Sequence, residues 1–365
     1  MEIVGIILVI VVFLAVAPRF LFRINDLSHL DNTHYPVREQ TPSDGLKPVL
    51  NLLSDLHRSV KPLKGKKKLR ALREHVDHLN DGLELASDIR PCQQPPGEWV
   101  IAPGVNPRRR VLYIHGGAWT AGSPRSHRAI TDRFSQLANA AVFAVDYRLM
   151  PENRFMEGVQ DCREGYRWLQ ENGPDGPEVL DFLVVAGDSA GGSHALALIA
   201  WIRDQGLRQA DATVALAPST DLTLTAPSNR DNIQTDALLG PMSGGLSKIP
   251  LPVTWWGTLL GFRVSPTNPL ASPLRGRLHD LPPTLIHATD QEMLLDNAKR
   301  YTTRARNAGS PVELHIWPGL VHVWHMFRQQ LPEAEEAFED IRRFLEEVES
   351  GHEQRAAGSI RRIVT

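Results

Sequence analysis

The sequence predicts an α/β protein built on a mostly parallel sheet with helices on both faces. From residue 110 onward, short apolar segments of strand length alternate with longer segments of helical periodicity. The composition is that of an ordinary globular protein, with 42% hydrophobic and 22% charged residues in a chain of 365. The net charge of −2 gives no reason to expect a nucleic-acid partner.

The elements of this predicted domain follow in order along the chain. The strands are short, apolar and rich in valine, isoleucine and alanine, at 111–114, 141–145, 182–186, 213–217, 283–288 and 312–316. The helices expected to cover the sheet lie at 130–137, 156–171, after residue 188, at 296–308 and at 334–349. Parallel strands joined by helices place all the strands' carboxyl ends at one edge, where such sheets bind their ligands.

The remaining segments divide the chain into further parts. Residues 24–100 are mostly polar with helical stretches at 46–56 and 67–85, and we expect them to form an N-terminal cap. The main α/β domain then spans 101–350. Within it, 220–281 is rich in proline and glycine and predicts a cap insertion over the carboxyl edge. Residues 351–365 are expected to be a loose tail.

The N-terminus predicts attachment to a membrane. Residues 3–17 contain no charge and no proline, and an anchor helix at 1–23 is expected, with Arg19 and Arg23 on its C-terminal side. That charge distribution favours a body in the cytoplasm. The alternative is a cleaved signal peptide and a secreted or periplasmic protein. The basic run Lys61–Arg73 is either a solvated helix start or a contact with anionic headgroups.

One pentapeptide predicts a nucleophilic serine. Ser189 stands within Gly187-Asp188-Ser189-Ala190-Gly191, between the strand at 182–186 and an apolar helix. A G-x-S-x-G between strand and helix is a nucleophile elbow, because small residues permit the sharp turn that exposes the hydroxyl. The N-terminus of the helix beneath it provides free N–H groups for a developing negative charge.

Two further segments supply an oxyanion hole and a base. Gly116 and Gly117 follow the strand at 111–114 within His-Gly-Gly-Ala-Trp, and their backbone, joined by the N–H of Ala190, can approach a substrate carbonyl. The base is expected after the last strand, where His322 stands; His287 and His325 are weaker alternatives.

The acid that orients the base is expected just after the strand at 283–288. Three carboxylates compete there, Asp290, Glu292 and Asp296. Asp296 stands at a plausible helix start and fits the role of a capping residue, whereas either of the other two can hold the imidazole in the tautomer that catalysis requires. The order serine, acid, histidine along the chain is that of an α/β-hydrolase.

These motifs resemble the hormone-sensitive-lipase-like family of α/β-hydrolases, which includes bacterial esterases and arylacetamide deacetylases. The resemblance covers about residues 110–347 and rests on several segments in order, namely H-G-G-A-W at 115–119, D-Y-R-L-M-P-E at 146–152, G-D-S-A-G-G at 187–192, S-P-L at 272–274 and P-G-L-V-H at 318–322. It implies an α/β-hydrolase fold with a cap. It assigns the acid to Glu292, with Asp290 as the alternative, and it gives Asp188 a structural role.

The resemblance implies a serine carboxylesterase or lipase that hydrolyses short- to medium-chain acyl esters, with no metal and no organic cofactor. Trp119, Trp255 and Trp256 are expected in the wall of the acyl pocket, although ordinary lid packing explains the last two equally well. An amidase, deacetylase or transacylase would use the same machinery. A ligand-binding protein without enzymatic activity is the alternative from another class, and the presence of both Ser189 and His322 argues against it.

Overall fold

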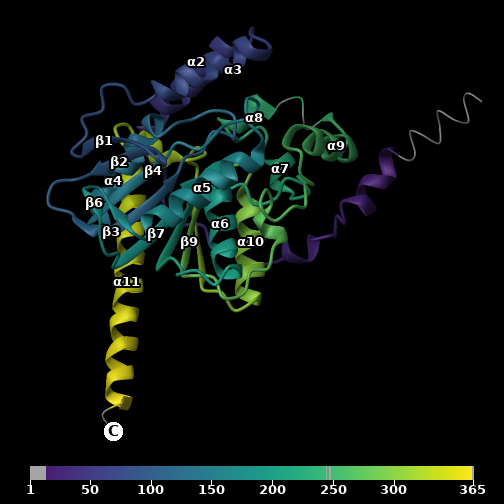
Figure 1. Ribbon diagram of the computed structural model, residues 1–365. Coiled ribbons are helices and arrows are strands. Elements are labelled where there is room, and N and C mark those ends of the chain that lie inside the picture. The colour runs from purple at the N-terminus through teal and green to yellow at the C-terminus, as the bar shows by residue number, and fades with distance from the viewer. Residues whose placement is uncertain (1–13, 244, 246–247, 364–365) are drawn as a thin grey trace, which may run out of the picture.

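A single mixed sheet of eight strands organises the protein (Figure 1). The computed structural model describes residues 14–243, 245 and 248–363, with the backbone alone described for 352–363. The strands of the sheet, in spatial order, are β1 (Asp88–Gln93), β2 (Pro96–Ile101), β4 (Ala140–Val145), β3 (Asn106–Ile114), β7 (Phe182–Asp188), β8 (Ala212–Leu216), β9 (Thr284–Thr289) and β10 (Val312–Trp317). Two short strands, β5 (Asn172–Gly173) and β6 (Gly176–Pro177), pair separately.

The six strands from β4 to β10 run parallel, so their carboxyl ends share one edge of the sheet. Strand β7 lies between β3 and β8, and all seven of its residues are buried. Because helices cover both faces of the sheet, these central strands are apolar without alternation. The strands β1 and β2 are antiparallel and complete one end of the sheet.

Two groups of helices cover the two faces. On one face, Ile130 and Phe134 of α4 (Arg128–Leu137) pack with Phe338 and Ile341 of α11 (Pro332–Ile363) against the sheet. The core on the other face includes side chains of α5 (Phe155–Leu169), α6 (Ser189–Asp204) and α10 (Leu295–Asn307). Both cores contain side chains of the same strands, so the sheet is buried from both sides.

The remaining helices lie toward the carboxyl edge of the sheet or on its connections. At the top of Figure 1, α2 (Leu46–Val60) and α3 (Gly65–Asp77) form a pair over this edge, and α8 (Leu239–Ser243) and α9 (Leu251–Phe262) lie beside it. The shorter elements are η1 (Ser28–Leu30), η2 (Arg125–His127), α7 (Ser228–Asp231), η4 (Pro273–Arg275) and η5 (Trp324–Phe327).

The predicted α/β-hydrolase fold is confirmed, and each strand and helix predicted from residue 46 onward corresponds to an observed element. Two boundaries differ. The expected cap segment 24–100 includes β1 and most of β2, which belong to the sheet. Both strands are short and contain a proline, Pro91 or Pro96, and β1 is largely exposed, so neither has the sequence pattern of a buried strand. The expected loose tail is also wrong in its first part, because α11 continues through 351–363.

The anchor predicted at 1–23 lies mostly outside the described residues. Residues 14–21 are helical. Over 14–243, 245 and 248–363, we find no helix that combines the length and the hydropathy needed to cross a membrane.

Candidate active site

The tight turn between β7 and α6 places Ser189 at the carboxyl edge of the sheet. Ser189 has φ 50°, in the left-handed region that non-glycine residues rarely adopt, as the strained turn of a nucleophile elbow requires. Gly191 is required for a different reason. A Cβ there would lie 1.9 Å from the carbonyl oxygen of Ile114, so no larger residue fits where the start of α6 passes the end of β3.

Ser189, His322 and Glu292 form one hydrogen-bonded chain. His322 Nε2 lies 2.9 Å from Ser189 Oγ, and His322 Nδ1 lies 2.6 Å from Glu292 Oε2. The second oxygen of Glu292 accepts the N–H of Thr289 at 3.1 Å, which fixes the carboxylate at the end of β9. With Nδ1 donating its proton to the carboxylate, Nε2 is left to accept the serine proton.

The electrostatics of this chain suit a base that is charged transiently. Burial disfavours the imidazolium of His322, but the hydrogen bond and charge of Glu292 outweigh it and raise the pKa of His322. Burial raises the pKa of the Glu292 carboxyl, and the hydrogen bond with His322 works against that rise. The side chain of Glu292 is fully buried, so its interaction with His322 is not weakened by water.

The two other candidate acids have structural partners. Asp290 Oδ1 accepts the N–H of Gly319 at 2.7 Å and thereby ties the loop that precedes His322 to the end of β9. Asp296, at the start of α10, accepts the N–H of Ser228 at 2.9 Å. Of the three, Glu292 is the one that the structure records in a hydrogen bond with His322.

The alternative histidines lie away from the serine. His287 and His325 are buried and their ring nitrogens are 3.0 Å apart. His287 Nε2 is also 3.1 Å from Asp340 Oδ2. Their positions agree with the preference for His322, because His287 lies within β9 rather than after a strand and His325 lies in η5.

The loop expected to bind the oxyanion follows β3, and one of the donors predicted in it, Gly116, has another partner. The N–H of Gly116 donates to Asp188 Oδ1 at 3.0 Å, so it is not available to a substrate. Tyr113 donates to the same oxygen at 2.6 Å, and His127 Nε2 lies 3.3 Å from Oδ2. A Cβ at position 116 would lie 2.1 Å from the Asp188 carboxylate. Asp188 therefore fastens the oxyanion loop to the elbow, the structural role expected for it.

Three backbone N–H groups at the serine remain for an oxyanion. Gly117 and Ala118 line the same cavity as Ser189, and no backbone acceptor in the described part of the chain is recorded for their N–H groups. Ala190 is the second residue of α6, and the first four N–H groups of a helix have no intrahelical partner. Gly117, Ala118 and Ala190 are therefore the candidate donors, with Ala118 in the place expected for Gly116.

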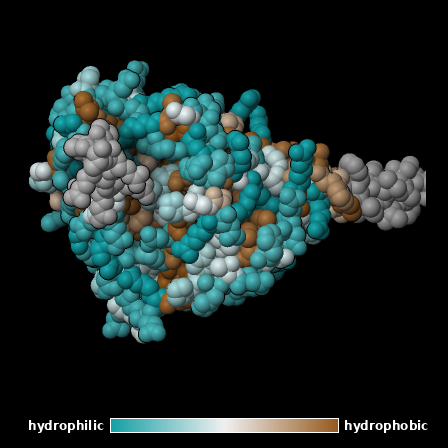
Figure 2. All heavy atoms as spheres, turned by 90° about the horizontal axis from the view of Figure 1, so that it is seen from below, coloured by the Kyte–Doolittle hydropathy of each residue, from teal (hydrophilic) through white to brown (hydrophobic). Residues whose placement is uncertain are grey.

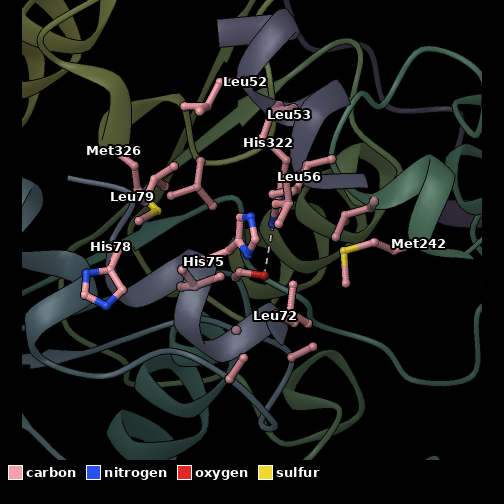
Figure 3. Close-up of a pocket in the computed structure, with 18 of the residues that line it drawn as sticks. Leu52, Leu53, Leu56, Leu72, His75, His78, Leu79, Met242, His322 and Met326 are labelled. Carbon is pink, nitrogen blue, oxygen red and sulfur yellow. Dashed lines mark hydrogen bonds between the residues drawn. The ribbon is translucent and has the colours of Figure 1, made fainter. Parts of the chain in front are cut away.

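Ser189 and His322 open into a cavity of about 660 Å³, within the usual range of ligand pockets. Figure 3 shows His322 beside leucines of α2 above and Met242 across the cavity, with the hydrogen bond of His322 dashed. The apolar lining includes side chains of α2, α3 and the loop with η5, among them Leu52, Leu53, Leu56, Leu72, Val323, Met326 and Phe327. Polar side chains of the cap, Asp55, Glu74, His75 and His78, are also part of the lining.

The three tryptophans expected in this wall are not among its lining residues. Trp119 is buried beneath the oxyanion loop, edge-on to Phe155 and Phe262. Trp255 is buried with Phe22 and Ile24, and Trp256 contacts Phe22 edge-on. The prediction for the pocket wall is therefore wrong, and the alternative of lid packing holds for α9. The true wall comes from leucines of α2 and α3, whose helical spacing was visible in the sequence but whose packing partners were not.

Two charged residues, Arg73 and Asp236, connect the cap to the site; Arg73 belongs to the basic run noted in the sequence, whereas Asp236 belongs to no motif there. Arg73 of α3 donates to the carbonyl oxygens of Thr120 and Met150 at 2.7 and 3.0 Å and forms two hydrogen bonds with Glu152. The Asp236 carboxylate accepts the N–H of Met293, which follows Glu292, and also accepts the N–H of Leu239, the first residue of α8. Neither residue has a sequence pattern that distinguishes it from a solvated charge.

One group of side chains has donor atoms close enough for a metal ion. His287, His315 and Asp340 bring one donor atom each within 4.8 Å of one another. Asp340 is already occupied, since both imidazoles and Arg343 bond to it and the guanidinium of Arg38 lies 4.0 Å away. The guanidinium groups of Arg343 and Arg38 oppose a metal ion, and the group does not line the cavity of Ser189.

Comparison with known proteins agrees with this geometry. The α/β-hydrolase fold family matches residues 111–326. An acetyl-hydrolase of Streptomyces hygroscopicus is 37% identical over 249 residues, which cover 68% of this chain and 78% of that protein. The esterase LipU of Mycobacterium tuberculosis is 34% identical over 248 residues, covering 68% of this chain and 80% of that protein.

Solved structures give the same result over a longer span. An esterase from the bacterial hormone-sensitive lipase family superposes with a TM-score of 0.71 at 30% identity, covering 84% of this chain and 98% of that one. A hormone-sensitive lipase from a metagenome library superposes with a TM-score of 0.70 at 28% identity, covering 85% and 99%. The chain therefore belongs to the α/β-hydrolase fold family and, within it, to the hormone-sensitive-lipase-like proteins.

Proposed function

We propose that this protein is a serine carboxylic ester hydrolase in which Ser189, His322 and Glu292 form the catalytic triad. The observation that carries the proposal is the buried chain of hydrogen bonds from Ser189 Oγ through His322 to Glu292, at 2.9 and 2.6 Å. The relatives named esterase, carboxylesterase and acetyl-hydrolase support ester hydrolysis as the reaction.

The reaction proceeds through an acyl-enzyme. Ser189 Oγ attacks the ester carbonyl while His322 Nε2 takes the serine proton, and Glu292 stabilises the imidazolium through Nδ1–H. The N–H groups of Gly117, Ala118 and Ala190 donate to the oxyanion of the tetrahedral intermediate. When that intermediate collapses, the C–O bond of the ester breaks and His322 gives its proton to the leaving alcohol. Water then attacks the acyl-enzyme by the same steps and releases the acid and Ser189.

The cavity favours uncharged acyl esters of short to medium chain length. Its walls near the serine are leucine, methionine and phenylalanine side chains, against which an acyl chain loses contact with water. The crystal structure of EstE5, which is 29% identical with a TM-score of 0.69, was obtained after a soak in p-nitrophenyl butyrate, which makes esters of this kind suitable first substrates. Amide hydrolysis and acyl transfer to another alcohol use the same residues and are tested with the same variants.

We further propose that residues 1–23 anchor the protein to a membrane with the α/β domain in the cytoplasm, a secreted or periplasmic protein being the alternative. The lysines at the α2–α3 turn support contact with anionic headgroups, because Lys61, Lys64, Lys66 and Lys67 are exposed. The last residue of that basic run has another role, since Arg73 binds Thr120, Met150 and Glu152.

The test is hydrolysis of p-nitrophenyl esters of increasing acyl length by the full chain and three variants. Ser189→Ala is expected to lower kcat by about 10⁶-fold, and Glu292→Gln by about 10⁴-fold, because the amide forces the wrong tautomer of His322. Asp290→Asn is the matched control, because Asp290 lies in the same loop two residues before Glu292. This variant is expected to keep its kcat within about tenfold of the parent value. Equal losses in Glu292→Gln and Asp290→Asn would contradict the assignment of the acid. An inactive parent that still binds acyl ligands would favour the ligand-binding alternative.

A further inference from the structure

An apolar surface that has no role in the triad lies along α9 and the helix at 14–21. Half of the fourteen exposed large hydrophobic side chains of the described residues belong to two short segments, four to the helix at 14–21 and three to residues 249–260. They are Leu14, Val16, Phe20, Leu21, Ile249, Val253 and Leu260, which we call the α9 surface. Figure 2 shows hydrophobic side chains gathered on the projection at the right-hand end of the molecule.

The composition of α9 is unusual for a surface helix. Its sequence, Leu-Pro-Val-Thr-Trp-Trp-Gly-Thr-Leu-Leu-Gly-Phe, contains no charged residue. A helix that is hydrophobic all round is normally buried on every side. Here Trp255 is buried whereas Leu260 is 77% exposed and Val253 57% exposed, so the outer side of α9 has no protein partner among the described residues.

The two segments form one surface because they bond to each other. Trp256 Nε1 donates to the carbonyl oxygen of Leu14 at 3.1 Å, and its ring meets that of Phe22 edge-on with centroids 5.2 Å apart. Thr267, just after α9, donates to the carbonyl oxygen of Phe22 at 2.6 Å. These contacts fix the exposed side chains of the helix at 14–21 beside those of α9.

Within the two segments that form this surface, the charged residues are all cations. No aspartate or glutamate occurs between Asp236 and Asp280, a stretch that contains Lys248 and Arg263 on either side of α9. The same holds between Glu2 and Asp26, where Arg19 and Arg23 are the charged residues. An apolar patch bordered by cations, with a tryptophan at its edge, suits the boundary between the headgroups and acyl chains of an anionic bilayer.

We propose that the α9 surface docks on an anionic lipid membrane. The uncharged run at residues 3–17 leads directly into this surface, which argues for a lipid partner rather than a protein partner. Docking is a property of the folded cap and adds to any anchoring by the N-terminus. It also brings the membrane close to the substrate cavity, because Leu239 and Met242 of α8 line that cavity and precede α9 by a few residues.

The experiment places an environment-sensitive NBD fluorophore at single sites of the full chain. Cys92 is first replaced by serine, because it is half-buried, whereas Cys162 is buried and stays. The probe is attached to Leu260→Cys, and the matched control carries it at Val179→Cys. Val179 is exposed to 66%, similar to Leu260, but precedes β7 and so lies at the opposite edge of the sheet from the elbow.

The protein is mixed with vesicles of phosphatidylcholine and phosphatidylglycerol, with and without bromine on the acyl chains. We expect the emission of the probe at 260 to shift to the blue and to be quenched by brominated chains, while the probe at 179 does neither. Adding Val253→Glu to the Leu260→Cys protein should reduce the bound fraction of this probe at least tenfold.

Three results would overturn the proposal. If the protein floats with vesicles while the probe at 260 is unchanged, the N-terminus anchors the protein alone. If the probe at 260 is already shifted without vesicles, another part of the chain covers the surface, or a second copy does when the shift depends on protein concentration. If neither the protein nor the probe responds to vesicles, the surface does not bind lipid.

Discussion

Arg73 is predicted to hold the cap over the active site. It leaves α3 and donates to the carbonyl oxygens of Thr120 and Met150, and its side chain is 29% exposed. Thr120 follows the loop that offers the Gly117 and Ala118 N–H groups. Replacing Arg73 by alanine therefore loosens both the cap and the oxyanion loop.

The magnitude follows from the two kinds of contact. Each hydrogen bond from the guanidinium to a carbonyl oxygen contributes about 1.5–3 kcal/mol. The pair with Glu152 adds at most about 1 kcal/mol, because Glu152 is 56% exposed to water. Allowing for the partial exposure of Arg73, we expect a loss of about 3 kcal/mol, which changes the equilibrium between closed and open cap by about two orders of magnitude.

The assay is steady-state hydrolysis of a p-nitrophenyl ester, together with amide hydrogen exchange of α3. Arg73→Ala is expected to lower kcat/KM at least about tenfold, since only the fraction of molecules with a closed cap binds productively. Protection of the α3 amides should fall by about 100-fold. Arg70→Ala is the control, because Arg70 stands one turn earlier, is 83% exposed and pairs with Glu74 alone. If the two variants behave alike, Arg73 does not hold the cap.

Three further results are expected. The logarithm of kcat/KM should rise with pH and level off above pH 6.5, because Glu292 raises the pKa of His322. Glu292→Gln should move this rising part of the profile to lower pH. A profile that does not move would contradict the pairing of Glu292 with His322. His315 has a pKa of about 9 through its bonds to Asp340 and Glu313, so it stabilises the fold below pH 6.5 and this stability is lost as pH rises through 9. Urea unfolding at pH 6.5 and 9.5 should show that loss in the parent and not in His315→Gln. Gly191→Ala should lower the free energy of unfolding by about 3 kcal/mol or more, since its Cβ would overlap the Ile114 carbonyl, whereas Gly257→Ala, with nothing within 4 Å, should not.

The residues proposed as the triad could be located from the sequence because each belongs to a local pattern. The elbow around Ser189 combines a buried strand, a glycine pair and an apolar helix within about twenty residues, and every part of that pattern has a steric reason in the structure. Glu292 follows β9 and His322 follows β10, which are parallel neighbours in the sheet, so the order of the strands brings both residues to the same edge.

The parts that could not be predicted depend on contacts between distant segments. The sequence around Gly116 predicts an oxyanion donor, but in the structure its N–H donates to the carboxylate of Asp188, 72 residues later in the chain. The spacing of the leucines in α2 predicts an amphipathic helix whose apolar side packs on the core. Leu53 does belong to the core, but it also lines the cavity, which the spacing does not indicate. The tryptophans of α9 pack on Phe22, more than two hundred residues earlier, which no local pattern indicates.

The most direct test of the central claim is the identity of the residue that a suicide ester modifies. The full chain is treated with a p-nitrophenyl alkylphosphonate, the released nitrophenolate is counted, and the adduct is located by peptide mass spectrometry. The account predicts one equivalent of nitrophenolate and a single adduct on Ser189, with labelling slowed by several orders of magnitude in His322→Ala. An adduct on another residue, or labelling of Ser189 that does not depend on His322, would contradict it.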